Sequence, residues 1–175
     1  MKIKQNIILI GYMGSGKTSV GKVLAKRLSY RFYDTDELLE QKAEDTISQI
    51  FSVHGEEYFR DLETKLLEEL SLDMNETVLS TGGGLPLRTQ NAELLKEMGY
   101  IVFLKATKQT TMNRLQGDIT RPLLQGDDLE KKVEQMLALR TPIYEKIAHR
   151  IVKTDGESVN DIVNIIMEAY RKQIH

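Results

Sequence analysis

The segment from Gly11 to Thr18 constrains the fold of this chain more than any other. It reads GYMGSGKT and matches the pattern GxxxxGK[ST] at every fixed position. Residues 7–10 form an apolar run before it, and residues 19–28 follow it with the spacing of an amphipathic helix. In a strand, loop and helix arranged this way, backbone N–H groups and the helix N-terminus hold phosphate oxygens. The segment therefore predicts a nucleoside triphosphate site on a strand that leads into a helix.

The side chains of this loop have separate expected tasks. Lys17 can reach the β- and γ-phosphates, and the Thr18 hydroxyl can ligate Mg²⁺. A purely structural turn would explain the glycines, but not a lysine and a threonine directly after them. The expected nucleotide-binding residues of this segment are Gly14, Ser15, Gly16, Lys17, Thr18 and Ser19.

Length, composition and charge indicate an ordinary globular protein. The chain has 175 residues, of which 29% are charged and 41% hydrophobic, and its formal net charge is −2. That charge offers no general attraction to nucleic acid, and no apolar stretch approaches the roughly 20 residues that cross a bilayer. The chain has no cysteine, which excludes disulfides and agrees with a reducing cytoplasm. We expect residues 1–175 to form one cytoplasmic, monomeric domain without nucleic-acid or membrane partners.

Short apolar runs alternate with longer helical patterns along the chain. Strands are expected at residues 5–10, 31–34, 76–81, 100–105 and 149–154. Helices are expected near residues 17–28, 35–43, 46–52, 55–71, 88–98, 108–115, 128–147 and 158–172. This alternation predicts an α/β fold, with a parallel sheet and helices on both of its faces.

Two segments depart from the simple alternation. Residues 35–72 form a helical insertion that is longer than a crossover between two strands needs. Residues 116–128 are polar at both ends, contain Gly117 and Gly126, and carry Arg121 in the middle. A loop of this length in a compact domain is usually functional or disordered. The central arginine favours a lid.

Two carboxylates follow the expected second strand. Asp34 and Asp36 lie at its carboxyl end, which faces the ligand crevice in an open α/β sheet. Side chains two residues apart on a strand point the same way, so both acids are expected to face the γ-phosphate. One could hold Mg²⁺ through water, and the other could accept a proton from an attacking hydroxyl. Alternatively, Asp36 caps the helix that follows, and both roles are compatible with the same segment.

Residues 82–84 are three glycines in succession at the end of the expected third strand. Because glycine loses much backbone entropy on folding, three of them predict a close approach of the backbone to a ligand or to the transferring phosphate. Ser80 and Thr81 precede them, where a triphosphatase normally carries the aspartate that positions Mg²⁺. The metal is therefore expected to depend on Thr18 and Asp34.

Arginines are expected to supply the remaining ligands. Arg60 lies on the helical insertion, Arg121 in the expected lid and Arg140 on a later helix. A guanidinium group can bind a carboxylate or a phosphate with two parallel hydrogen bonds, which lysine cannot do. Most arginines are nonetheless solvated surface residues, so each assignment also needs support from its surroundings.

Taken together, these residues resemble the shikimate kinase family, and the resemblance covers essentially the whole chain. The matching elements are Gly11–Thr18, Asp34-Thr35-Asp36, Gly55-Glu56, Phe59-Arg60, Glu63, Thr81-Gly82-Gly83-Gly84, Arg121-Pro122-Leu123-Leu124, Arg140 and Tyr144. The phosphate loop alone is shared by many unrelated enzymes. The ordered set at these intervals is specific to this family.

The resemblance implies an ATP-dependent kinase that phosphorylates the 3-hydroxyl of shikimate to give shikimate 3-phosphate, in aromatic amino acid biosynthesis. It also implies a three-layer P-loop kinase fold, with five parallel strands in the order 2-3-1-4-5, and Mg²⁺ as cofactor. Residues 35–72 would form the shikimate-binding part. Asp36 would act as base or orienter for the 3-hydroxyl, and Arg60 and Arg140 would clamp the shikimate carboxylate. The residues expected to pack against the ring are Gly82, Gly83 and Gly84.

On the nucleotide side, the resemblance implies further contacts. Asp34 would reach Mg²⁺ through water, Arg121 would move onto the phosphates with the lid, and Arg114 would stack on adenine. The expected catalytic residues are Lys17, Asp36 and Arg121. Two departures from the family pattern are visible. Many family members carry a proline in the adenine-side loop after the fifth strand, whereas residues 154–159 contain none and Ser158, which begins the next helix, is expected to replace it structurally. Near Glu44 a glycine is common in the family, and its absence is expected to affect a helix boundary.

Three other functions are compatible with parts of the sequence. A gluconate kinase would also use an arginine clamp and an acid, because gluconate also offers a carboxylate and hydroxyls. A regulatory GTPase would need an Asn/Thr-Lys-x-Asp motif, but the closest string, at residues 152–155, reads VKTD. A noncatalytic binding module would not need Lys17, Asp36 and Arg121, which are all present.

Overall fold

The computed structural model describes residues 4–116 and 128–175, and its five strands form one parallel sheet. The strands are β1 (Asn6–Ile10), β2 (Arg31–Asp34), β3 (Thr77–Ser80), β4 (Tyr100–Lys105) and β5 (Arg150–Lys153). Their order across the sheet is β2-β3-β1-β4-β5, which confirms the expected order. All five expected strands are present, and their ends differ from the expected ones by at most one residue.

The helices also lie in the expected segments. They are α1 (Lys17–Leu28), α2 (Thr35–Ala43), α3 (Ile47–His54), α4 (Glu56–Asp73), α5 (Thr89–Met98), α6 (Lys108–Leu115), α7 (Leu129–Ile147) and α8 (Val159–Ile174), with a short 3₁₀ turn, η1 (Leu85–Leu87). Over the ranges that the structure describes, no helix is long and apolar enough to span a bilayer.

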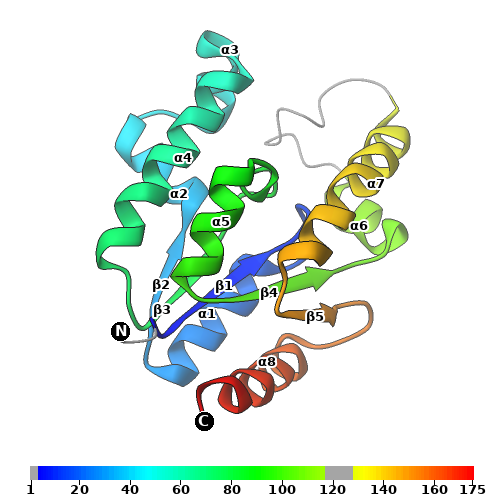
Figure 1. The fold of residues 1–175 in the computed structure, drawn as a ribbon. Coiled ribbons are helices and arrows are strands. Elements are labelled where there is room, and N and C mark those ends of the chain that lie inside the picture. Colours follow the sequence, from blue (N-terminus) through cyan, green and yellow to red (C-terminus); the bar gives the residue numbers. More distant parts are fainter. Residues whose placement is uncertain (1–3, 117–127) are drawn as a thin grey trace.

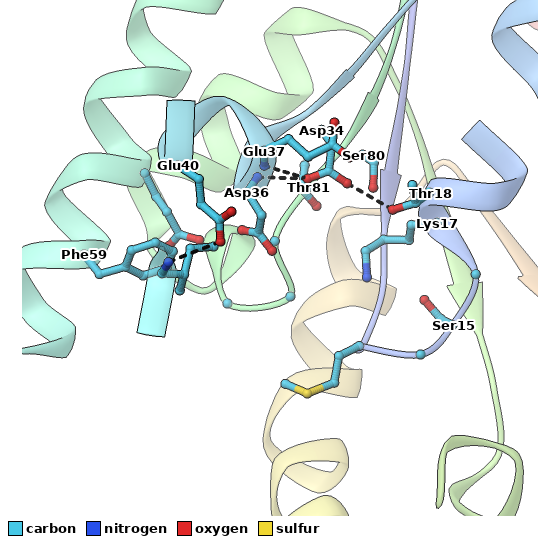
Figure 2. Close-up of a pocket in the computed structure, with 18 of the residues that line it drawn as sticks. Ser15, Lys17, Thr18, Asp34, Asp36, Glu37, Glu40, Phe59, Ser80 and Thr81 are labelled. Carbon is cyan, nitrogen blue, oxygen red and sulfur yellow. Dashed lines mark hydrogen bonds between the residues drawn. The ribbon is translucent and has the colours of Figure 1, made fainter. Parts of the chain in front are cut away.

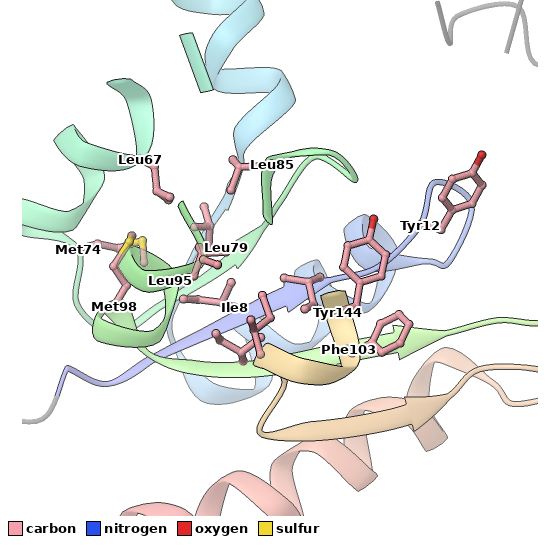
Figure 3. Close-up of a cluster of buried hydrophobic side chains, with 14 of the residues drawn as sticks. Ile8, Tyr12, Leu67, Met74, Leu79, Leu85, Leu95, Met98, Phe103 and Tyr144 are labelled. Atoms are coloured by element: carbon pink, nitrogen blue, oxygen red, sulfur yellow. The ribbon is translucent and has the colours of Figure 1, made fainter. Parts of the chain in front are cut away.

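Helices cover both faces of the sheet and give three layers (Figure 1). Ile7 and Leu9 of β1 pack with residues of α1 and α8 on one face. Ile8 and Ile10 pack with residues of α4, α5 and α7 on the other face (Figure 3). Alternate residues of a strand point to opposite faces, so a central strand covered on both sides favours apolar residues at successive positions, as at residues 7–10. This explains the unbroken apolar run before the phosphate loop.

The carboxyl ends of β1, β2 and β3 meet at one edge of the sheet. Ser80 near the middle of this edge pairs with Leu9 of β1 on one side and Asp34 of β2 on the other. The phosphate loop and the glycines follow β1 and β3, and Asp34 ends β2 with Asp36 two residues after it. Strand pairing therefore brings together three segments that are far apart in the sequence, at the edge where open α/β sheets bind ligands.

The helical insertion consists of α2, α3 and α4 and has a small apolar cluster of its own, formed by Leu39, Ile50, Phe59 and Leu66. The expected lid, residues 116–128, lies outside the described residues except at its two ends. Arg121 also lies outside them. Asp128 caps α7, because its side chain accepts a hydrogen bond from the backbone N–H of Lys131.

Candidate active site

A cavity of about 430 Å³ lies at the carboxyl edge of the sheet, between the phosphate loop and the helical insertion (Figure 2). The predicted site residues that line it are Gly14, Ser15, Gly16, Lys17, Thr18, Ser19, Asp34, Asp36, Arg60, Gly82, Gly83, Gly84 and Arg140. Arg114 lies beside the phosphate loop, where its Nη1 donates to the Gly14 carbonyl oxygen at 2.8 Å. Arg121 lies outside the described residues. The structure thus gathers every other predicted site residue at or beside one cavity.

The phosphate loop is built to present backbone N–H groups. Gly14 and Gly16 have φ angles of 76° and 93°, a backbone conformation that favours glycine. Gly16 is the N-cap of α1, and because glycine has no side chain, no side-chain hydrogen bond caps this helix. A helix N-terminus that no side chain caps favours the binding of an anion. Lys17 Nζ donates to the carbonyl oxygens of Gly11 and Tyr12, at 2.7 and 3.1 Å.

Thr18 and Asp34 meet at the end of the cavity beside the phosphate loop. Thr18 Oγ1 donates to Asp34 Oδ2 at 3.0 Å. The other oxygen, Asp34 Oδ1, accepts from the backbone N–H groups of Asp36 and Glu37 at 2.9 and 3.3 Å (Figure 2). Asp34 is therefore the N-cap of α2, and the hypothesis that Asp36 caps this helix is wrong.

A hydroxyl and a carboxylate form a set of hard oxygen ligands that suits Mg²⁺. The described residues contain no group of three or more histidines, cysteines or acids that could enclose a metal ion by themselves. This fits an ion that takes one or two protein oxygens and completes its shell with phosphates and water. The pair formed by Thr18 and Asp34 is thus compatible with the expected cofactor.

Asp36 lies in the first turn of α2 and not on β2. The argument that two strand side chains point the same way therefore does not apply to Asp34 and Asp36, because the chain turns into a helix between them. Both carboxylates nevertheless line the cavity. A side-chain carbon at Gly82 would lie 2.8 Å from Asp36 Oδ1 and 3.0 Å from Glu63 Oε1. Asp36 thus lies against the first of the three glycines.

The triple-glycine loop (residues 82–84) also brings the two predicted arginines together. A side-chain carbon at Gly83 would lie 3.0 Å from Arg140 Nη1, and one at Gly84 would overlap the Arg60 guanidinium group. None of the three glycines has a φ angle in the left-handed region that favours glycine. Glycine is required at these positions because a larger residue would displace the charged groups. The requirement comes from close packing and not from the backbone conformation of a turn.

The two guanidinium groups have different partners. Arg60 pairs with Glu63 at 2.7 Å and with Glu56 at 3.3 Å. Burial lowers the pKa of Arg60, but the two carboxylates outweigh this effect and raise it overall. Within the described part of the chain, Arg140 Nε and Nη1 are buried without a hydrogen-bond partner. Because a buried cation with unpaired N–H groups is costly, this arrangement favours an anionic ligand at Arg140.

Glu63 is a cavity residue to which sequence analysis assigned no role. Its side chain is 1% exposed, and burial raises its pKa to about 7, against the lowering effect of Arg60. Its spacing of three residues from Arg60 on one helix could have indicated the pair. The other lining residues without a predicted role are Met13, Glu37, Glu40, Ile47, Phe51, Phe59, Ser80 and Thr81.

Comparisons with known proteins agree with this geometry. The family model for shikimate kinase matches residues 13–171. A shikimate kinase from Burkholderia thailandensis is 41% identical over 162 residues, which cover 93% of this chain and 88% of that protein. The solved structure of a shikimate kinase from Acinetobacter baumannii in complex with shikimate has a TM-score of 0.93 and 37% sequence identity. That match covers 97% of this chain and 94% of the other.

More distant structures share the fold alone. A gluconokinase from Sinorhizobium meliloti has a TM-score of 0.58 and 16% sequence identity, over 99% of this chain and 95% of its own. Identity at this level carries no information about the acceptor. The architecture is therefore common to kinases with different acceptors, and the residues around the cavity must make the distinction.

Proposed function

Since this chain belongs to the shikimate kinase family, and so catalyses the ATP-dependent phosphorylation of shikimate in aromatic amino acid biosynthesis, we propose that the cavity described above is its active site. The observation that carries this proposal is the buried guanidinium group of Arg140, which lies beside the triple-glycine loop with two nitrogen atoms unpaired among the described residues. The carboxylate of shikimate is the anion that would satisfy it.

At the acceptor end, Arg60 and Arg140 hold the shikimate carboxylate, and the backbone of Gly82, Gly83 and Gly84 packs against its ring. Asp36 accepts the proton of the 3-hydroxyl or orients that hydroxyl toward the γ-phosphate. The support is that both arginines and Asp36 contact the same short loop, so one small molecule touching the loop reaches all three. The product is shikimate 3-phosphate.

At the nucleotide end, the backbone of Gly14, Ser15 and Gly16 and the side chain of Ser19 surround the phosphates of ATP. Lys17 leaves its present carbonyl partners for the β- and γ-phosphates, which offer it stronger, charge-assisted hydrogen bonds. Arg114, beside the loop, stacks on adenine. Arg121 keeps its proposed role as a lid residue from the sequence, since it lies outside the described residues.

Mg²⁺ is the proposed cofactor, held by the Thr18 hydroxyl and, through water, by Asp34. When bound, it neutralises negative charge on the β- and γ-phosphates. The direct Thr18–Asp34 hydrogen bond keeps both oxygens on the same side of the cavity. We further propose that the enzyme acts as a cytoplasmic monomer, on shikimate and ATP, without a nucleic-acid or membrane partner.

Acceptor-dependent turnover tests the proposed function. ADP formation is measured with ATP and Mg²⁺ in the presence of shikimate, of gluconate, or of no acceptor. We expect rapid ADP formation only with shikimate, and phosphorus NMR of the product should show a phosphate on the 3-oxygen. Equal turnover with gluconate, or turnover without an acceptor, would contradict the assignment of the acceptor end.

A further inference from the structure

The triple-glycine loop is held from two sides by buried hydroxyl groups. Thr35 Oγ1 accepts a hydrogen bond from the backbone N–H of Gly82 at 2.8 Å. On the other side, the Tyr144 hydroxyl donates to the Gly83 carbonyl oxygen. Thr35 and Tyr144 are both completely buried. They belong to α2 and α7, so two different helices hold one loop.

This loop has few other means of keeping its position. Glycines have no side chains to pack and are the most flexible residues of the backbone. Yet each glycine approaches a charged group of the acceptor end, so a small shift of the loop would change the space between Asp36, Arg60 and Arg140. Anchoring by hydrogen bonds is therefore the main way in which the loop can be kept in register with these groups.

The Thr35 hydroxyl is separable from helix formation. The N-cap of α2 is Asp34, whose carboxylate already accepts from the first N–H groups of the helix. Thr35 is thus not needed as a cap, and its hydroxyl bonds to a different segment. Because Thr35 is fully buried and Gly82 is buried as well, removal of that hydroxyl leaves the Gly82 N–H without the partner it has in this structure.

The Tyr144 hydroxyl is likewise separable from packing. Its ring lies against Phe103, with the ring centres 5.1 Å apart, and the hydroxyl points out of the apolar cluster (Figure 3). Tyr144 follows Arg140 by one turn of α7, so both side chains face the loop. Burial raises the pKa of Tyr144 to about 12, and the group therefore remains a donor at neutral pH.

We propose that Thr35 and Tyr144 are positioning residues, which fix the triple-glycine loop through their hydroxyl groups and so set where shikimate lies relative to Asp36 and Arg140. This inference rests on the proposed function, because it needs the loop to border the shikimate site. It gives the middle residue of the Asp-Thr-Asp motif a task of its own.

The test compares substitutions that remove a hydroxyl with substitutions that keep it. Thr35→Val and Tyr144→Phe keep the shape of each side chain and remove its hydroxyl. Thr35→Ser keeps the hydroxyl and removes a methyl group. Matched controls are Thr77→Val and Tyr170→Phe, which remove buried hydroxyls whose partners are the Asn75 carbonyl oxygen and the Tyr30 hydroxyl, away from the cavity.

We expect Thr35→Val and Tyr144→Phe each to lower kcat/KM for shikimate by about 10- to 100-fold, since small misplacement of reacting groups has effects of this size. KM for ATP should change by less than about twofold, because the nucleotide contacts are untouched. Thr35→Ser and the two controls should stay close to wild type. All assays are run well below the lowest melting temperature among the variants.

Two results would overturn the positioning role. One is a Thr35→Val enzyme with wild-type kcat/KM for shikimate, and the other is an equal loss in Thr35→Ser and Thr35→Val, which would indicate packing. Asp36→Asn, measured alongside, separates this inference from the proposed function. If Asp36→Asn is inactive while Thr35→Val is normal, only the positioning role fails. If Asp36→Asn is active, the assignment of the acceptor end fails.

Discussion

Two arginines line the cavity at its proposed acceptor end, but their charges are compensated to different degrees. Arg60 is bound by Glu63 and Glu56, whereas no salt bridge to Arg140 lies within the described residues. The buried guanidinium group of Arg140 also lies over the Tyr12 ring, at 5.4 Å from its centre. A ligand carboxylate must compete with the direct Glu63 ion pair at Arg60, whereas Glu63 attracts Arg140 only from a longer distance. The two residues should therefore contribute unequally to shikimate binding.

We predict that Arg140→Lys raises KM for shikimate more than Arg60→Lys does. Lysine keeps the charge but loses the planar pair of N–H donors, and a charge-assisted hydrogen bond contributes about 1.5–3 kcal/mol, or roughly 10–150-fold in affinity. Steady-state kinetics with shikimate and ATP varied separately give the comparison. Arg88→Lys is the control, because Arg88 pairs with Glu57 and Asp61 outside the cavity. Equal increases in KM for ATP would place both arginines at the nucleotide instead.

Asp34 combines a structural and a proposed chemical role that one substitution can separate. Asparagine is as good an N-cap as aspartate, so Asp34→Asn should leave α2 intact. It removes the negative charge near Mg²⁺, and we expect the Mg²⁺ concentration for half-maximal activity to rise severalfold while the far-ultraviolet circular dichroism stays unchanged. Asp161→Asn, on α8, is the matched control. An unchanged Mg²⁺ requirement would limit Asp34 to its capping role.

At the scale of elements, the first strand, phosphate loop and first helix could be predicted because each depends on local pattern. The start of α2 could not. Asp34, Thr35 and Asp36 all suit an N-cap, and the choice depends on where β2 ends. The pairing of Asp34 with Ser80 carries β2 as far as Asp34, and that contact joins segments distant in the sequence. The other end of α2 agrees with the expected helix, which ends at residue 43. Glu44 follows it in the left-handed conformation, with a φ angle of 52°, which a glycine would adopt more easily.

The triple-glycine loop illustrates the same limit. Its composition predicts close approach, but the groups that approach it come from α2, α4 and α7 and are visible only after folding. The pair formed by Gly82 and Thr35 joins residues 47 positions apart. No local pattern specifies such a contact. Sequence therefore indicates which residues are special here, while the partners that make them special follow from tertiary structure.

Two glycine substitutions separate an effect on the cavity from an effect on the stability of the fold. At Gly84, an alanine would overlap the flexible end of Arg60, so we expect Gly84→Ala to raise KM for shikimate with little loss of stability. At Gly99, an added carbon would lie 2.5 Å from the backbone oxygen of Asn6, which cannot easily move. Gly99→Ala should therefore lower the melting temperature, while the folded enzyme keeps its kinetic constants. Thermal unfolding and kinetics of both variants check this, and the reverse pattern would contradict it.

At the scale of the whole molecule, Glu63 should make stability depend on pH. Its pKa is raised from 4.5 to about 7 in the folded protein, so the folded state binds more protons than the unfolded state between these values. By linkage, the free energy of unfolding falls as pH rises through this window. The contribution of Glu63 is fully present below its unfolded pKa and is lost above pH 7. Urea unfolding across this range measures the slope.

Glu63→Gln provides the comparison for this slope. The variant loses the titrating group. The free energy of unfolding of the variant minus that of wild type should therefore increase between pH 5 and pH 7, because both values lie in the window set by a Glu63 pKa raised to about 7. Carboxylates that do not interact with Glu63 cancel in the difference, whereas Asp36 is coupled to Glu63 and adds to it. A difference that does not change with pH would show that the carboxyl group of Glu63 titrates normally.

The central claim is that Asp36 acts on the acceptor hydroxyl in a cavity whose nucleotide end is separate. Single-turnover phosphoryl transfer from ATP to shikimate, measured by rapid quench for wild type and Asp36→Asn, tests it most directly, with ATP affinity determined by calorimetry. Asparagine keeps the size but removes the proton acceptor and the charge. We predict a fall in transfer rate of roughly 10²–10⁴-fold with nearly unchanged ATP affinity. An Asp36→Asn enzyme that keeps most of its transfer rate would contradict the account.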